Sequence, residues 1–487
     1  MTITDPPNKP DELKSGVLGA GSIALIVIAA AAPLALIAGY GPIGFLVAGI
    51  GAPAGFLIAG IVVALFIVGV VSMTRYIKRP GAFYTYIGQT LGRPSGNASA
   101  TLAISAYLLV QVGGMGIISA TTQNLIQILT GISIPWWIIG AVLVLLIWLV
   151  CRRGIDVGVK LILVLLTAEV ALLLLVAIAV IANIAPAQGI SGASFAPENV
   201  FVPGMAAASL VWFGAFFGIE STTLYRAESK DPKRSVPRAT AISLVFLALF
   251  YCFVAWSIAQ AFTVPELAAQ IADDPTAMLY IVSEYYVGTW SGIVAQILLV
   301  TSSFSSAIAY FNAINRYGHS MATEGILPRA AARVHPKYKS PSFGNFQALL
   351  TGAIVVLFGL MGLDPYRQLT VWFSSPGTIG IMALMALTSV AVVVFFASKK
   401  EHPRGPRMAI IGASTLATLL IIGAIVSMIA NIQLLTDADG VINLFVVLTP
   451  AIIFLAVFVT SAFRRSKYPD SDQRNQLTDM EPMKETS

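Results

Sequence analysis

Charge is the scarcest feature of this sequence. Only 11% of its 487 residues are Asp, Glu, Lys or Arg, whereas 57% are hydrophobic. A soluble globular domain carries roughly 25% charged residues, so this composition excludes an ordinary soluble protein. It indicates a chain that places much of its surface against lipid.

Residues that build disulfides and metal sites are equally few. The chain has two cysteines, Cys151 and Cys252, and both fall within or at the end of apolar runs. A disulfide framework or a metal site needs more such side chains at a recognisable spacing. The three histidines, His319, His335 and His402, form no cluster. We therefore expect no metal and no cofactor, and the absence of a catalytic cluster disfavours a membrane enzyme.

Long apolar runs are what the sequence has in abundance. A helix needs about 20 residues to cross about 30 Å of hydrocarbon. We therefore predict an all-α integral membrane protein with twelve transmembrane helices, the first of which is too long for a cleaved signal peptide. The predicted spans are residues 16–40, 44–74, 97–129, 135–151, 157–184, 204–226, 237–262, 290–322, 343–362, 367–397, 408–431 and 440–463.

Positive charge is almost absent from one side of this predicted topology. Of 29 Lys and Arg residues, only Arg367 falls outside when the N-terminus is placed inside. Cytoplasmic loops carry the excess of Lys and Arg, so the pattern predicts that both termini are cytoplasmic. The same pattern explains the net charge of +6 by the orientation of the protein in the membrane, and not by binding to nucleic acid. Residues 75–93 are predicted to form an amphipathic inner segment, and residues 264–286 a helix over the outer face.

Two of the predicted spans are interrupted. The first contains AAAAPL, with Pro33 in its middle, and the sixth contains FGAFFG, with Gly214 and Gly218. Proline and glycine weaken a helix, and the backbone groups that they release must be buried or line a wet cavity. The two breaks lie five spans apart, and an odd number of spans inverts a second copy of the unit. Paired broken helices of this kind indicate a transport site near the membrane midplane.

The breaks offer groups for both ends of an amino acid. Pro33 suits the first position of a half-helix, which leaves the amides of Leu34 and Ala35 predicted free for a carboxylate. Loose carbonyls at both breaks are predicted to accept from an ammonium group. The alternative is that Pro33 only kinks a structural helix. The predicted substrate-binding residues are Ala31, Ala32, Leu34, Ala35, Gln111, Phe213, Gly214, Ala215, Phe217 and Gly218.

Two carboxylates lie deep in the apolar spans, where a charge costs about 2.5–3.5 kcal/mol. Glu220 begins the inner half of the sixth span, and we predict that it and Phe216 hold and gate the break. Glu169 lies roughly 18 Å into the fifth span at 1.5 Å per residue, with no cation nearby in the sequence. We predict that it is protonated at rest and carries a coupling proton. The alternative for each is a purely structural buried acid.

A hydroxyl-rich stretch, TSSFSSA at residues 301–307, opens a further possibility. Clustered hydroxyls can join first-span carbonyls to coordinate Na⁺, and Ser305 or Ser306 would supply them. Such hydroxyls also commonly hold transmembrane helices together without any ion. The sequence leaves both interpretations open.

Three motifs connect the chain with a known group of proteins. GIESTTLYRAESKDPKRSVPRA at 218–239 resembles the sixth-span signature of the amino acid–polyamine–organocation superfamily. RPGAFYTYI at 79–87 is similar to the segment that follows its second span, with Ala82 in place of a glycine, and FNAINRYGHSMATEGILP at 311–328 resembles the end of its eighth span. The resemblance covers about residues 16–400. It implies a LeuT-like core in which helices 1 and 6 are broken.

This chain departs from the family pattern at two places, and the resemblance also implies how the chain is divided into parts. The first break usually reads G-x-G-[IV]-F, where this chain has AAAAPLALI, and some members place a lysine near the position of Glu169. The expected parts are a cytoplasmic tail (1–15), a first five-helix repeat (16–184), an inverted second repeat (204–397), two additional helices (408–463) and a cytoplasmic C-terminal tail (464–487).

The sequence therefore predicts a secondary active transporter for amino acids in the plasma membrane, working by alternating access. Nothing near the breaks supplies a fixed charge to a substrate side chain, which favours neutral amino acids, and the coupling role predicted for Glu169 favours proton symport. The expected partners are the amino acid, the proton and the lipid bilayer, with no nucleic acid and no oligomeric state specified. The alternatives are Na⁺ coupling, amino acid or amine exchange, and a membrane sensor that binds without transport.

Overall fold

The chain folds into a bundle of long apolar helices. The structure, a computed structural model, describes residues 19–73, 76, 83–153, 159–219, 222, 229–323, 326–335, 341–398 and 404–467. Across these ranges the chain is helical apart from loops and one antiparallel bridge between Val334 and Pro341. Ten of the described helical segments are long and apolar enough to cross a membrane, which makes this a multi-pass membrane protein.

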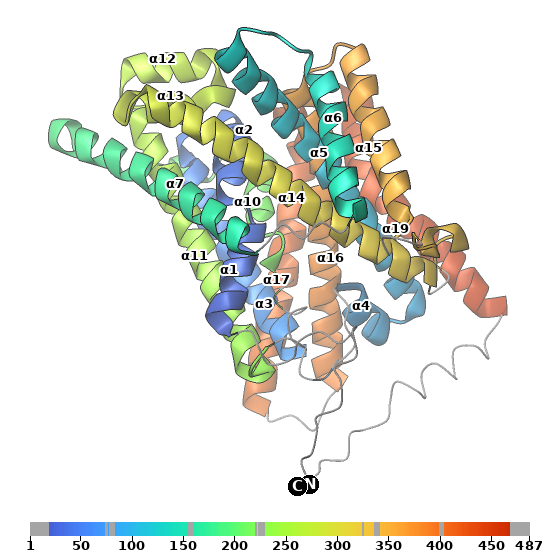
Figure 1. The fold of residues 1–487 in the computed structure, drawn as a ribbon. Helices are drawn as coiled ribbons and strands as arrows, with labels where there is room; N and C mark the ends of the chain where they lie inside the picture. The colour runs from blue at the N-terminus through green and yellow to red at the C-terminus, as the bar shows by residue number, and fades with distance from the viewer. Residues whose placement is uncertain are drawn as a thin grey trace, which may run out of the picture.

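The long helices pack side by side, and α14 runs obliquely across the bundle (Figure 1). Their near-continuous apolar sequences fit elements that face both lipid and neighbouring helices. They are α3 (Ala52–Met73), α5 (Arg93–Thr130), α6 (Trp136–Arg153), α7 (Val159–Gln188), α11 (Pro232–Ala261), α14 (Thr289–Thr323), α15 (Phe343–Leu360), α16 (Val371–Ser398), α17 (Arg404–Ala430) and α19 (Gly440–Lys467).

The two spans that were predicted to be broken are broken in the structure. The first consists of α1 (Ala20–Ala30) followed, after a gap, by η1 (Ala35–Tyr40) and α2 (Gly41–Ala48). The sixth consists of the short helices α9 (Pro203–Ala207) and α10 (Ser209–Gly214) and then turns. Because α1 and α10 are too short to cross alone, ten segments and not twelve reach spanning length. Twelve crossings stay a prediction.

Short helices connect the long ones at opposite ends of the bundle. The helix α4 (Phe83–Leu91) lies between α3 and α5, and covers part of the predicted amphipathic segment. The helices α12 (Pro265–Asp273) and α13 (Met278–Tyr286) lie between α11 and α14. They confirm the helical character predicted for residues 264–286, although as two helices. Figure 1 shows α4 toward one end of the bundle, and α12 and α13 at the other.

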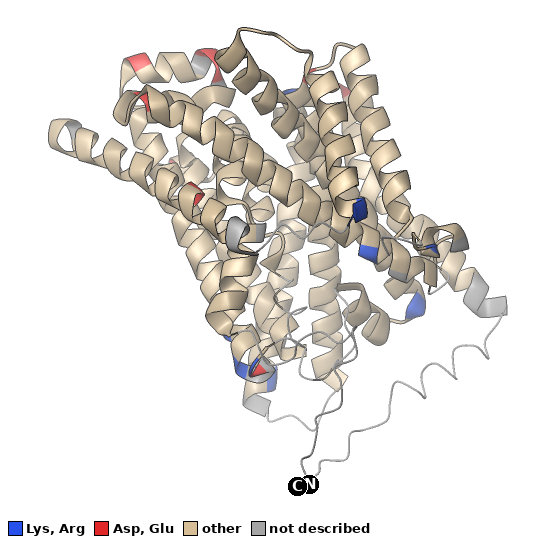
Figure 2. Cartoon of the chain, viewed as in Figure 1, with Lys and Arg blue, Asp and Glu red and all other residues tan. Residues whose placement is uncertain are grey.

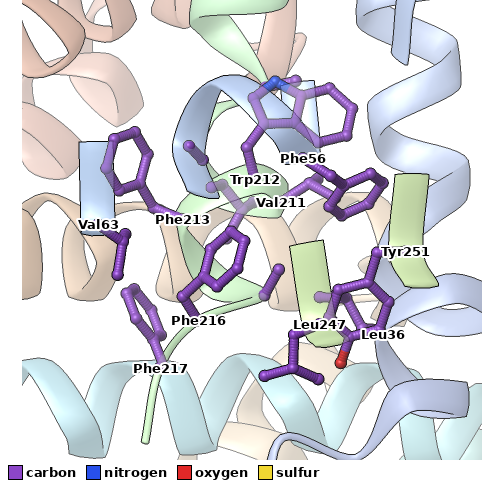
Figure 3. Close-up of a cluster of buried hydrophobic side chains, with 14 of the residues drawn as sticks. Leu36, Phe56, Val63, Val211, Trp212, Phe213, Phe216, Phe217, Leu247 and Tyr251 are labelled. Atoms are coloured by element: carbon purple, nitrogen blue, oxygen red, sulfur yellow. The ribbon is translucent and has the colours of Figure 1, made fainter. Parts of the chain in front are cut away.

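The packing of the Trp212 side chain fixes α10 against α2 and α3. A Cβ atom at either Gly44 or Gly55 would lie 2.5 Å from the Trp212 ring, so these two positions admit no side chain. The indole N–H donates to the carbonyl of Met205 at 2.9 Å, and Phe56 meets the ring edge-on at 5.0 Å between centroids. Figure 3 shows this cluster beside the second break. The second break therefore starts from a rigidly packed helix.

Candidate functional site

A cavity of about 100 Å³ lies where the two breaks meet, between residues of α5, α14 and α16. Most of the predicted substrate-binding residues line it. Leu34, Phe213, Ala215 and Gly218 are not among its lining residues. Those that line it are Ala31, Ala32, Ala35, Gln111, Gly214 and Phe217. Their contact with a substrate stays a prediction.

The first break is held by a carboxylate from another helix. Ala32 adopts a left-handed φ of +45°, which turns the chain before Pro33. The Leu34 amide donates to Oε2 of Glu169 on α7 at 3.3 Å, and Glu169 is only 4% exposed. The prediction that this amide is free is therefore wrong, because a buried acid accepts from it. The Ala35 amide has no hydrogen-bond partner among the described residues, and Ala35 lines the cavity.

A tyrosine from a second helix holds the other side of the first break. The Tyr251 hydroxyl on α11 donates to the carbonyl of Ala31 at 3.4 Å, and the Tyr251 side chain is fully buried. Tyr251 and the Ser302 hydroxyl of α14 both lie close to Glu169. Three helices thus bring polar groups to one interruption of the backbone. A carbonyl oxygen has two lone pairs, so the Ala31 carbonyl can still accept from a substrate.

The second break closes its own hydrogen bonds. Gly218 has a φ of +96°, and the Phe216 and Phe217 amides donate to the carbonyls of Phe213 and Gly214 at 3.0 and 3.2 Å. The Gly214 carbonyl, predicted to be loose, therefore has one partner and one remaining lone pair. No atom lies within 4 Å of the place where a Cβ of Gly214 would stand. The absent side chain leaves the cavity open at this point.

Of the two predicted gating residues, the structure describes Phe216 but not Glu220. Phe216 is buried at 3% exposure and lines a smaller apolar cavity together with Val63 and Phe213. Phe217 lines both this and the central cavity, and Figure 3 shows these rings grouped on one side of the cluster. Glu220 lies outside the described residues. Gating by Glu220 and Phe216 stays a prediction.

The cavity also has polar lining residues beyond the predicted substrate-binding set, some of them in the hydroxyl-rich stretch at 301–307. The hydroxyls of Tyr40 and Ser374 lie 3.3 Å apart, and Ser306, named above as a possible sodium ligand, also lines the cavity. Ser305 is not among the lining residues, and its hydroxyl donates to the Thr301 carbonyl of its own helix at 2.9 Å. The further polar lining residues are Ser303, Tyr310 and Thr378.

One sequence signal pointed to part of this set. Residues 303, 306, 307 and 310 line the cavity and follow the i, i+3, i+4, i+7 pattern, which places them on one face of a helix. Ser374 and Thr378, four residues apart on α16, share a face in the same way. None of the described residues that line the cavity is charged. The site therefore offers hydroxyls, amides and carbonyls but no fixed ionic partner.

Comparison with known proteins agrees with this arrangement. A Bacillus subtilis branched-chain amino acid permease, BcaP, is 26% identical over 207 residues, which is 42% of this chain and 40% of the relative. The methylthioribose transporter of the same organism is 25% identical over 264 residues, covering 54% and 52%. Cationic amino acid transporter 4 of Mus musculus is 28% identical over 218 residues, covering 44% and 32%. The chain thus spans about a third to a half of the length of these relatives.

All three relatives carry the names of transporters and not of enzymes. The sequence profile of one family matches far more of the chain than any of these pairwise alignments. It is the family described as amino acid permease, and the match runs from residue 17 to residue 466. The resemblance seen in the three motifs is confirmed by this match, and the chain belongs to the amino acid permease family, as a multi-pass protein of the plasma membrane.

Proposed function

We propose that this permease is a proton-coupled symporter of neutral amino acids that works by alternating access. One observation carries the proposal: a buried carboxylate, Glu169, accepts from the Leu34 amide at the break that lines the cavity. A group that can gain or lose a proton is thereby attached to the part of the backbone nearest the substrate. The same bond offers a physical route between protonation and the shape of the site.

The coupling follows from the strength of that hydrogen bond. A bond to an ionised acceptor is roughly twice as strong as one between neutral groups. Ionised Glu169 therefore holds the half-helix that begins at Leu34 more tightly against α7 than protonated Glu169 does. Proton uptake would loosen the first break, and proton release on the other side of the membrane would restore it. In this mechanism Glu169 controls the break and does not contact the substrate.

Substrate recognition would rest on uncharged groups. The Ala35 amide, at the start of a half-helix, suits the substrate carboxylate, because a helix N-terminus favours negative charge. The second lone pairs of the Ala31 and Gly214 carbonyls suit the ammonium group. The absence of charge from the lining supports neutral side chains. This choice agrees with the name of the branched-chain relative more than with that of the cationic one.

Two further features support the inverted-repeat architecture. The connections bearing α4 and the pair α12 and α13 follow the second and seventh predicted spans, which are five spans apart, and lie at opposite ends of the bundle (Figure 1). An inverted second repeat would place equivalent connections in this way. Acidic residues gather near α12 and α13, while most of the Lys and Arg of the described residues lie away from that end of the bundle (Figure 2). This distribution supports cytoplasmic termini.

Uptake into proteoliposomes tests the proposal. A panel including leucine, arginine and methylthioribose would be measured under an imposed pH gradient, for the wild type and Glu169→Gln. Glutamine keeps an oxygen that can accept from the Leu34 amide but cannot carry the proton. We expect pH-driven accumulation of neutral amino acids by the wild type, and binding or exchange without accumulation by the variant. Equal pH-driven uptake by both would refute the coupling role of Glu169.

Sodium coupling is the second candidate, because Ser306 and Ala31 line the same cavity. Replacing the pH gradient by a Na⁺ gradient would drive uptake only in this case. Ser306→Ala would then abolish the Na⁺ dependence, whereas Ser305→Ala is a matched control whose hydroxyl is engaged within its own helix. Substrate binding without uptake under either gradient would favour the sensor.

A further inference from the structure

A second pocket of about 80 Å³ lies at the junction of α6, α14 and α15. It shares no lining residue with the substrate cavity. Trp148 and Arg152 reach it from the end of α6, and His335 from the loop that follows α14. None of the described residues that line it is acidic. The pocket thus contains a cation without a carboxylate among the residues that line it.

The contacts that Arg152 makes with described residues engage only part of its donor capacity. Its guanidinium stacks over the Trp148 ring at 4.8 Å, and one of its N–H groups donates to Nε2 of His335 at 3.2 Å. A guanidinium can only donate, so Nε2 of His335 must accept and the ring proton must reside on Nδ1. Arginine has five N–H donors in a rigid fork, a geometry that matches the oxygens of a phosphate group.

An unsatisfied acceptor lies in the same pocket. Asn315 of α14 is 6% exposed, and its Oδ1 has no hydrogen-bond partner among the described residues. Gly344 of α15 packs against this side chain so closely that a Cβ there would lie 2.7 Å from Nδ2. Buried polar atoms are usually paired, and leaving one unpaired is costly. The pocket therefore contains a positively charged donor, Arg152, and a buried acceptor, Oδ1 of Asn315. A ligand with an anionic oxygen and a hydroxyl group would satisfy both.

We propose that this pocket binds a phosphate-type anion that also carries a hydroxyl group, at Arg152 and Asn315. The guanidinium would bind the phosphate oxygens, and the ligand hydroxyl would donate to Oδ1 of Asn315. Two sources have this chemistry. One is the headgroup of an anionic phospholipid such as phosphatidylglycerol, since basic pockets between transmembrane helices bind lipid phosphates. The other is free inorganic phosphate, which keeps a P–OH group near neutral pH.

Binding to the delipidated full-length protein tests the proposal. Native mass spectrometry would compare retention of phosphatidylglycerol and phosphatidylcholine, and calorimetry would compare inorganic phosphate with sulfate, which has no hydroxyl near neutral pH. We expect preference for phosphatidylglycerol if the source is lipid, and for phosphate over sulfate if the source is soluble. Arg152→Gln should weaken binding of the preferred ligand at least about tenfold, because it removes a charge-assisted hydrogen bond to the anion.

Arg153→Gln is the matched control. Arg153 is the next residue on the same helix end, carries the same charge, is exposed and does not line the pocket. It should leave binding unchanged. Asn315→Asp gives a second test that does not depend on Arg152→Gln folding well, because it keeps the side-chain shape and places a negative charge beside the anion. Equal losses for both arginine variants, binding unaffected by Asn315→Asp, or no preference for either probe would overturn the proposal.

Discussion

The two breaks that border the cavity are held in different ways. At the first, the Leu34 amide and the Ala31 carbonyl bond to Glu169 and Tyr251, which lie 135 and 220 residues away in the sequence. At the second, the Phe216, Phe217 and Ile219 amides each donate to the carbonyl three residues earlier. Among the described residues, the bonds named at the first break come from other helices, whereas those named at the second are local to its own backbone.

This difference has a consequence for motion. A displacement of α7 or α11 relative to α1 must change the hydrogen bonds of the first break, since those bonds join separate helices. The turns of the second break can move as a unit without losing their internal bonds. The first break is therefore suited to respond to events elsewhere in the bundle, and the second to act as a local hinge around Gly218.

Removing Glu169 should produce the largest effect on this comparison. Glu169→Ala leaves the buried Leu34 amide without an acceptor and opens a void, and we expect a loss of about 2–3 kcal/mol of stability. Thermal unfolding of the purified protein measures it. Glu169→Gln is the control, because its amide oxygen preserves the acceptor. If the two variants unfold at the same temperature, the carboxylate does not support the first break.

Gly218→Ala should have the next largest effect, this time on the second break. At a φ of +96° an L-residue is strained, and we expect a loss of about 1–2 kcal/mol. Gly192→Ala is a suitable control, because Gly192 has a φ of −89° and no atom within 4 Å of its would-be Cβ. Comparable unfolding temperatures for the two variants would show that the second break does not need a left-handed residue.

Sequence reasoning located both breaks but not their supports. Proline and glycine are visible interruptions in an apolar pattern, so the breaks near Pro33 and Gly218 followed from residue type alone. The Leu34–Glu169 bond did not, because nothing in a single sequence shows which helices become neighbours. The sequence predicts Glu169 and the first break as separate features. The structure joins them, because Glu169 accepts from the Leu34 amide of the break.

The polar lining of the cavity shows the same limit. The Ser303 and Ser306 hydroxyls belong to a helical stripe that a sequence can display, whereas Tyr40 and Ser374 come from segments 334 residues apart that meet only in the folded bundle. A long apolar helix carries little information about which of its faces meets the site, since every face is hydrophobic. Close packing against small residues decides this, as where Ser374 of α16 lies against Gly113 of α5.

Removing the Tyr251 hydroxyl should weaken the first break only slightly. Its hydrogen bond to the Ala31 carbonyl is long, at 3.4 Å, so Tyr251→Phe should cost about 1 kcal/mol or less. Tyr286→Phe is the matched control, because the Tyr286 hydroxyl is buried without a hydrogen-bond partner among the described residues. Thermal unfolding of the two variants should show a lower unfolding temperature for Tyr251→Phe only. Equal behaviour would leave Glu169 as the principal support of this break.

The smallest effect is expected at Ala32, and its smallness is informative. Ala32→Gly relieves the strain of a φ of +45°, worth about 1 kcal/mol, but gives the unfolded chain more freedom, worth about 0.5–1 kcal/mol. The two contributions nearly cancel, so stability should change by less than about 0.5 kcal/mol. Ala35→Gly, at the helical start of η1, gains no such relief and should lose about 0.5–1 kcal/mol. Thermal unfolding of both variants separates the cases. Equal losses at the two positions would mean that Ala32 carries no backbone strain, and the turn before Pro33 would then rest on Glu169 and Tyr251 alone.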